Sequence, residues 1–290
     1  MSISLWQVIV LAAIQGLAEL LPVSSSAHVV VAEKLMGVDP STPEMTLLLV
    51  MLHTGTMFAV IVYFWNKWRG TYFQSLATFK RFATRVALAT AMTGGIGEAL
   101  IKVIERGAFR GQSHGEVEEL FSHLELIAPA LAAVGVLILI AGIVKRRATA
   151  GNSVADEIGL GQAGLIGAVQ GLCLPFRGFS RSGATISTGM LAGVSRVSAE
   201  NFSFALAVVL TPLAVAREAF RLIKATHINT DAGLASAIVP SVVGAVFAFV
   251  AGLVALKWLS SWLEHGLWYL FGVYCLLASA AVALLYYAGY

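Results

Sequence analysis

The sequence predicts an all-α polytopic membrane protein with an inverted-topology repeat, two re-entrant helical hairpins and about six transmembrane helices. Composition is the first observation: 58% of the 290 residues are hydrophobic and 12% are charged. Soluble domains carry about twice that charged fraction. Mean hydropathy is +0.82. The second observation is a series of long apolar runs, and the third is a pair of similar hydroxyl-rich stretches that interrupt apolar sequence. The net charge of +3 is modest and predicts no nucleic-acid partner.

The first half begins with two apolar segments that are too short to cross a bilayer. Residues 4–21 are largely apolar but are interrupted by Gln15 and Glu19. Pro22 and a serine cluster then separate them from the apolar segment His28–Met36. Crossing ~30 Å of hydrocarbon needs about 20 apolar residues. A hairpin that enters and leaves by one face is therefore predicted, because its broken backbone can be buried in protein. Long apolar runs follow at 45–65, 82–104 and 124–144.

The same pattern restarts after the polar linker 148–157. An apolar segment at 158–174, a polar segment at 175–185 and a short apolar segment at 186–194 predict a second hairpin. Three further spans follow at 201–220, 236–256 and 267–288. Each half is thus one hairpin plus three spans. This divides a single integral membrane domain into a first repeat at 1–147 and a second at 158–290.

Basic residues in short loops predict the orientation, because such loops stay cytoplasmic. Loops 66–85 and 145–157 are basic, whereas loop 105–123 is acidic and is expected outside. Both termini are then external. With three spans per half, the two hairpins start from opposite faces, so their broken elements would meet near the midplane and form one site.

The segment Gly178–Thr185 carries the residues best suited to bind a phosphate. It combines two serines, a threonine and an arginine with glycine-freed backbone N–H groups. The alternative is an ordinary loop between two helices. A second stretch, Gln15–His28, favours the functional interpretation because the two stretches are similar. Gln15-Gly16-Leu17 recurs as Gln170-Gly171-Leu172, and Ser24-Ser25-Ser26-Ala27 aligns with Ser180-Arg181-Ser182-Gly183.

Glu19 is the residue of the first stretch that most needs an explanation. A carboxylate in an apolar helix is costly and is by default a functional hypothesis, although a helix-end role at the interface is an alternative. Gln15 shares its helical face. The group suits attack on phosphorus, with Arg181 holding the phosphate and Glu19 acting as base or cation ligand. Either Ser25 or His28 could be the nucleophile. His53 and Thr54 open an apolar run, and for them we expect a helix-end role, with support of the site residues as the alternative.

At these motifs the chain resembles the undecaprenyl-diphosphate phosphatase family, also called the bacitracin-resistance protein family. The resemblance extends over essentially the whole chain and is strongest in Gln15–His28, His53–Trp68 and Gly178–Ser187. It implies hydrolysis of undecaprenyl diphosphate to the monophosphate at the outer face of the bacterial cytoplasmic membrane. It also implies help from a divalent cation, Mg²⁺ or Ca²⁺, and lipid as the partner; a homodimer is a further expectation.

The resemblance also assigns roles to individual residues. The catalytic residues would be Glu19, Ser25, His28 and Arg181, and Glu19 would also hold the cation together with the substrate phosphates. Among the substrate-binding residues, the resemblance covers Gln15, Ser180, Ser182 and Thr185. Ser24, Ser26, Gly183 and Arg177 are further substrate-binding candidates from their positions in these stretches, and Arg177 is expected at the rim of the site, where it would steer the anion.

The chain departs from the family pattern in two places. Pro175-Phe176-Arg177-Gly178 stands where the family has Pro-Gly, and Ser26-Ala27-His28 and Val31 replace the usual Thr-Gly-His and following glycine. The competing function is a transporter or flippase for an anionic lipid or phosphate-bearing solute, because inverted repeats with broken helices are also a transporter design.

Overall fold

The computed structural model describes residues 3–39, 42–108, 123–147, 157–226 and 232–289. All regular structure in these residues is helical. The helices are α1 (Leu5–Leu20), α2 (Ser25–Met36), α3 (Pro43–Tyr72), α4 (Leu76–Ala108), α5 (Leu124–Arg147), α6 (Leu160–Cys173), α7 (Arg181–Leu191), α8 (Arg196–Thr226), α9 (Ala232–Glu264) and α10 (Trp268–Tyr287).

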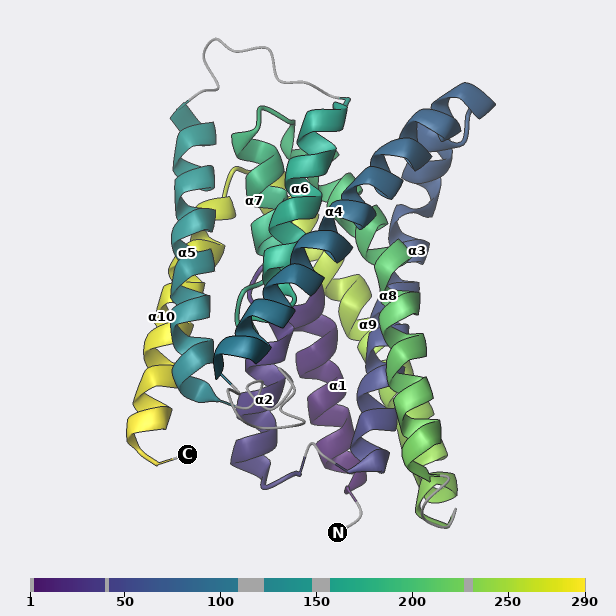
Figure 1. Ribbon diagram of the computed structural model, residues 1–290, viewed down its shortest axis with the longest axis vertical. Coiled ribbons are helices and arrows are strands. Elements are labelled where there is room, and N and C mark those ends of the chain that lie inside the picture. Colours follow the sequence, from purple (N-terminus) through teal and green to yellow (C-terminus); the bar gives the residue numbers. More distant parts are fainter. Residues whose placement is uncertain (1–2, 40–41, 109–122, 148–156, 227–231, 290) are drawn as a thin grey trace.

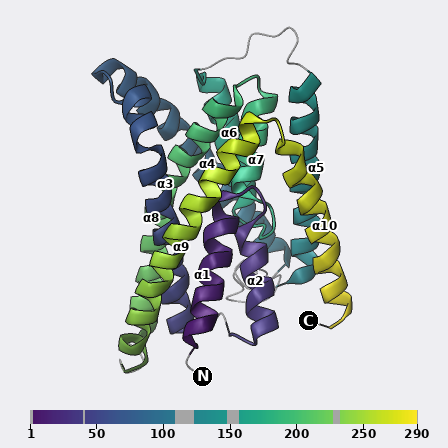
Figure 2. The same ribbon diagram turned by 180° about the vertical axis from the view of Figure 1, so that it is seen from behind.

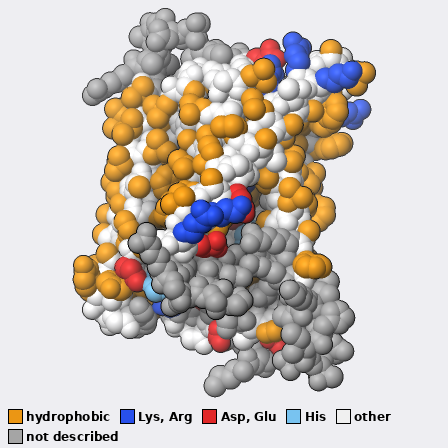
Figure 3. Space-filling model, in the orientation of Figure 1, with side chains coloured by type: hydrophobic (Ala, Val, Ile, Leu, Met, Phe, Trp, Pro, Cys, Tyr) orange, Lys and Arg blue, Asp and Glu red, His pale blue; other side chains and the backbone are white. Residues whose placement is uncertain are grey.

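Six of the described helices are long and apolar enough to cross a membrane, namely α3, α4, α5, α8, α9 and α10. The helices α1 and α6 are apolar but shorter. The predicted all-α polytopic fold is therefore confirmed. Hydrophobic side chains cover much of the side of the molecule seen in Figure 3, as a surface that faces hydrocarbon requires.

The predicted loop 66–85 is wrong in extent, because helix covers most of it. The helix α3 continues to Tyr72 and α4 begins at Leu76. Lys and Arg are good helix formers, so a helix continues past the end of its apolar run. The predicted acidic loop 105–123 and linker 148–157 lie mostly outside the described residues.

Each short helix pair is joined by a sharp turn that the sequence explains. Pro22 disfavours helix continuation after α1, and Ser24 takes a left-handed conformation with φ of 68° before α2 begins. In the second pair, Gly178 has φ of 99°, a value that glycine adopts without strain. Ser180 then caps α7 by accepting a hydrogen bond from the Gly183 backbone N–H at 3.2 Å.

The two helix pairs lie at opposite ends of the molecule and their turns face its middle. Figures 1 and 2 show α1 and α2 in the half that contains both termini, and α6 and α7 in the other half. The junction of α3 and α4 lies at the end opposite the termini. A short pair followed by three long helices occurs twice along the chain. The assignment of residues 1–147 and 158–290 as repeats remains a prediction.

Glycines allow the hairpin helices to approach the long helices closely. A Cβ added to Gly16 of α1 would lie 2.6 Å from the Ala248 carbonyl oxygen of α9, and one added to Gly167 of α6 would lie 2.2 Å from the Ala89 carbonyl oxygen of α4. Real Cβ atoms do not approach that closely, so a larger residue would force these helices apart.

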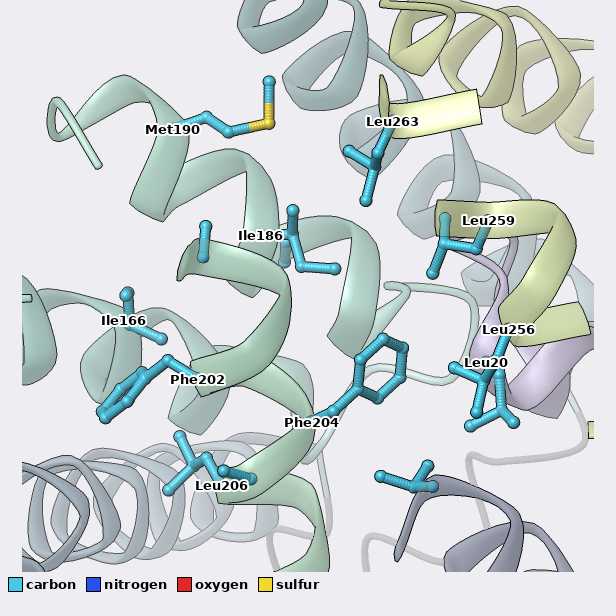
Figure 4. Packing of buried hydrophobic residues seen from close by; sticks show 14 of the residues in the cluster. Leu20, Ile166, Ile186, Met190, Phe202, Phe204, Leu206, Leu256, Leu259 and Leu263 are labelled. Atoms are coloured by element: carbon cyan, nitrogen blue, oxygen red, sulfur yellow. The ribbon is translucent and has the colours of Figure 1, made fainter. Parts of the chain in front are cut away.

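A hydrophobic core behind the turns fixes them in place. Figure 4 shows Leu20, Ile186, Phe204, Leu256 and Leu259 converging from α1, α7, α8 and α9, and all five side chains are buried. Dense packing of this kind restricts backbone movement. The polar residues at the turns are therefore held on a rigid base.

Candidate active site

A cavity of about 370 Å³ lies where the two helix pairs meet. Its polar lining residues come from both pairs, from α3 and from the segment that joins α6 to α7. They are Gln15, Glu19, Ser24, Ser25, Ser26, His53, Gln170, Arg177, Ser180, Arg181 and Ser182. The structure thus brings together most of the residues proposed from the two separate stretches.

Glu19 lines this cavity and contacts residues of both helix pairs. Its Oε1 accepts a hydrogen bond from Arg181 Nη2 at 2.7 Å. Its Oε2 accepts hydrogen bonds from Ser25 Oγ at 2.5 Å and from Gln15 Nε2 at 3.1 Å. The Glu19 side chain is only 15% exposed. A carboxylate in such a place is stabilised by the charged and polar donors around it.

Ser25 is placed for activation as a nucleophile. It is the first residue of α2, and its hydroxyl donates to Glu19. A serine hydroxyl attacks readily only when a neighbouring base removes its proton. The short contact supplies that geometry.

His28 lies outside the cavity, so the expected grouping of His28 with Glu19 is not found. Its Nδ1 is 2.7 Å from the Ser24 carbonyl oxygen, and its Nε2 is 2.7 Å from the hydroxyl of Tyr274 on α10. The two rings also stack, with centroids 5.7 Å apart. His28 therefore connects the first turn to α10, a contact that the sequence did not predict.

Hydrogen bonds join the two turns directly. The Gly178 backbone N–H donates to Ser26 Oγ at 3.4 Å, and Ser182 Oγ donates to the Leu21 carbonyl oxygen at 3.2 Å. Within each turn, two serine hydroxyls lie close together, at 3.3 Å for Ser24 and Ser26. These contacts hold the two sides of the cavity at a fixed separation.

Two residues expected to bind substrate support the second turn instead. Thr185 is fully buried and bonds to the Arg181 carbonyl oxygen at 2.8 Å and to Ser203 Oγ at 2.6 Å. A Cβ added to Gly183 would lie 2.8 Å from Ile138 Cδ1, so a side chain at this position would require Ile138 to move. Neither residue lines the cavity. Both keep Arg181 at the start of α7.

His53 corrects a second expectation. It lies inside α3, which begins at Pro43, and not at a helix end. Its Nδ1 bonds to the Leu49 carbonyl oxygen at 2.8 Å, and its Nε2 lies 3.9 Å from Glu19 Oε2. The polar pair His53-Thr54 within the apolar run 45–65 was the available signal for a residue of the site.

Arg177 and Arg181 lie near different acidic residues. Arg177 is partly buried, lines the cavity and interacts electrostatically with Glu33 of α2. Arg181, by contrast, is bonded to Glu19 itself. The two arginines therefore belong to different ion-pair environments.

The residues that the structure describes do not form a resident metal cage. Among the described residues, no three His, Cys, Asp or Glu side chains are grouped so that they could hold a metal ion. Glu19 is the one carboxylate among the described residues that line this cavity. Mg²⁺ is commonly held by one or two carboxylates together with substrate phosphates, and this lining fits that arrangement.

Comparisons with known proteins find a matching family and similar chains. A family model described as bacitracin resistance protein BacA matches residues 8–281. A protein of Acinetobacter baylyi named undecaprenyl-diphosphatase 2 is 58% identical over 284 residues, which cover 97% of this chain and 98% of the relative. A protein of Desulfosudis oleivorans named undecaprenyl-diphosphatase is 36% identical, over 93% of this chain and 94% of the relative. A protein of the same name from Anaeromyxobacter dehalogenans is 33% identical, over 95% of this chain and 89% of the relative.

Proposed function

The chain belongs to the bacitracin resistance protein BacA family. On this premise we propose that it hydrolyses undecaprenyl diphosphate to undecaprenyl phosphate and inorganic phosphate in the cavity where the two helix pairs meet. The reaction returns the lipid carrier to cell-wall synthesis and confers bacitracin resistance. One observation supports the assignment: Glu19 contacts both Arg181, the proposed phosphate ligand, and Ser25, the proposed nucleophile.

The geometry supports a two-step transfer. Arg181 binds oxygens of the terminal phosphate, because its planar guanidinium matches them bidentately. Ser25 Oγ attacks the terminal phosphorus while Glu19 takes its proton, and the anhydride P–O bond breaks to release undecaprenyl phosphate. Water then attacks the phosphoserine, and inorganic phosphate leaves as Ser25 regains its proton. Positioning and charge neutralisation supply most of the catalysis in phosphoryl transfer.

The residue of this cavity that would hold a divalent cation is Glu19. Glu19 would hold it together with phosphate oxygens, and the cation would neutralise charge on the diphosphate. The remaining contacts to the substrate come from the serines and Arg181. This division suits a cavity that has a single carboxylate in its lining.

The site is proposed to open to the external face of the bacterial cytoplasmic membrane. The basic junction of α3 and α4 lies at the end opposite the termini, which supports external termini and a first hairpin that enters from outside. A cysteine at Gln74, in a variant lacking the free thiols Cys173 and Cys275, should resist an impermeant reagent in intact cells, whereas a terminal tag should be accessible. Labelling of both from outside would reject this orientation. A homodimer remains a prediction, and one chain suffices to line the cavity.

Phosphate release in detergent separates hydrolysis from transport. The purified wild-type protein in micelles should release inorganic phosphate from undecaprenyl diphosphate, and Arg181→Ala should lose most of this activity. Transport has no meaning without two compartments, so an anion carrier would bind the lipid and release it unchanged. Absence of phosphate release from folded wild-type protein would favour the transporter.

A further inference from the structure

Gln170 of α6 is a buried polar residue that neither the fold nor the mechanism above uses. Its side chain is 1% exposed and lines the cavity. Within the described residues, its Oε1 is buried without a hydrogen-bond partner. A buried amide that lacks partners is destabilising, and most buried polar atoms in native proteins are paired. The fold therefore retains at this position a group that leucine would replace at no loss of hydrogen bonding.

Gln15, the equivalent residue of the first hairpin, has a carboxylate partner that Gln170 lacks among the described residues. Gln15 is also 1% exposed, and its Nε2 donates to Glu19, four residues later. Leu174 stands four residues after Gln170. Both glutamines line the same cavity. The amide of Gln15 is thus engaged with a carboxylate, whereas Gln170 has no acidic neighbour at the corresponding position.

We propose that Gln170 is a substrate-binding residue whose side-chain amide contacts the diphosphate. Its Nε2 donates to a phosphate oxygen, and its Oε1 accepts from a water molecule bound beside that phosphate. The cavity, at about 370 Å³, has room for a phosphate with ordered water, since each water occupies about 30 Å³ in the liquid. This inference rests on the proposed function and adds a ligand contact from α6.

A neutral donor has a distinct advantage next to the Arg181–Glu19 pair. A cationic side chain at position 170 would compete with Arg181 for Glu19, which is the one carboxylate among the described lining residues. An amide binds a phosphate oxygen without adding charge. Gln170 therefore orients the anion and leaves the Glu19 ion pair intact.

Three variants test the proposal, with one glutamine of the same helix as control. Gln170→Leu removes both polar atoms, and Gln170→Glu keeps the shape but adds a negative charge. Gln162→Leu is the control, because Gln162 binds the Ala192 carbonyl oxygen at 2.9 Å and the Gly159 N–H at 2.7 Å, away from the cavity. Each purified protein is assayed for phosphate release from undecaprenyl diphosphate and for its melting temperature with and without that lipid.

Gln170→Leu should melt no lower than the wild type without lipid, because an unpaired buried amide is lost. Its kcat/KM should fall by roughly 10- to 100-fold, the loss expected for a hydrogen bond to a charged group. Gln170→Glu should fall further, because its carboxylate repels the phosphate, and should regain activity as pH is lowered. Gln162→Leu should keep kcat/KM within about twofold, as substitutions away from such contacts do.

If Gln170→Leu behaves like the wild type, Gln170 only fills space in the protein and does not bind the substrate. Gln170→Leu with wild-type kcat/KM and an undiminished melting-temperature increase on lipid addition would overturn the proposal. If wild type and Gln162→Leu release no phosphate, the proposed function fails separately. The lipid-induced increase in melting temperature then still decides whether Gln170 contacts the diphosphate.

Discussion

Arg181 and Glu19, which belong to different helix pairs and are 162 positions apart, form an ion pair with Nη2 and Oε1 2.7 Å apart. Their side chains are only 26% and 15% exposed, so solvent screens the pair weakly. A phosphate that enters the cavity must share the guanidinium with Glu19. The pair therefore links assembly of the two halves to substrate binding.

The first prediction separates the two arginines of the second turn. Arg181→Lys keeps the charge but loses the planar fork, so it should lower kcat by about two to three decades, equivalent to roughly 3–4 kcal/mol. Arg177→Ala should mainly raise KM, and added salt should shrink that difference because partly exposed charges are screened. Steady-state phosphate release at low and high ionic strength gives both values. Wild-type turnover by Arg181→Lys with inactivity of Arg177→Ala would reverse the assignment.

The second prediction identifies the nucleophile. Ser25 contacts Glu19, whereas both ring nitrogens of His28 are engaged with Ser24 and Tyr274. Rapid quenching with substrate labelled at the terminal phosphate should therefore trap an acid-stable phosphoserine. The label should disappear in Ser25→Ala and persist in His28→Ala. A label that is lost in acid but survives alkali would point to phosphohistidine and contradict the role of Ser25.

The third prediction concerns the cation. Because one carboxylate lines the cavity, binding should depend on the substrate phosphates, and a chelator should lower activity in a way that added Mg²⁺ or Ca²⁺ reverses. Gln15→Glu adds a carboxylate beside Glu19 and should reach half-maximal activity at a lower cation concentration. Titration of activity against free cation measures this. Full activity after exhaustive chelation would remove the cation from the account.

The fourth prediction tests helix packing through two glycines. Gly167→Ala should destabilise the protein by roughly 1–3 kcal/mol, because its Cβ would lie 2.2 Å from the Ala89 carbonyl oxygen. Gly95→Ala on α4 meets no heavy atom within 4 Å and should be neutral or stabilising by up to about 1 kcal/mol. Thermal denaturation in detergent compares them. Equal melting temperatures would show that α4 and α6 can separate without cost.

The sequence predicted the features that depend on local pattern. The lengths of the apolar runs distinguished α1 and α6 from the six long helices. The similarity of the two stretches predicted that Glu19 and Arg181 belong to one site, and the two side chains are hydrogen-bonded. Both are consequences of composition and repetition along the chain. Helix ends were less predictable, because α3 continues past its apolar run to Tyr72.

Side-chain direction could not be predicted in the same way. His28 turns toward Tyr274, which is far away in sequence, and His53 enters the site only because α3 passes beside α1. Thr185 bonds to Ser203 of α8 and so supports the turn from behind. Each outcome depends on which long helix packs against a hairpin, and that contact leaves no local signal.

The most direct test of the whole account is phosphate release by Glu19→Gln. Glutamine keeps the shape but cannot take the Ser25 proton or pair with Arg181 as an anion. The variant should insert into the membrane and fold, yet turn over undecaprenyl diphosphate at least about 100-fold more slowly, the usual contribution of a general base. Near-normal turnover by folded Glu19→Gln would contradict the assignment of this cavity as the catalytic site.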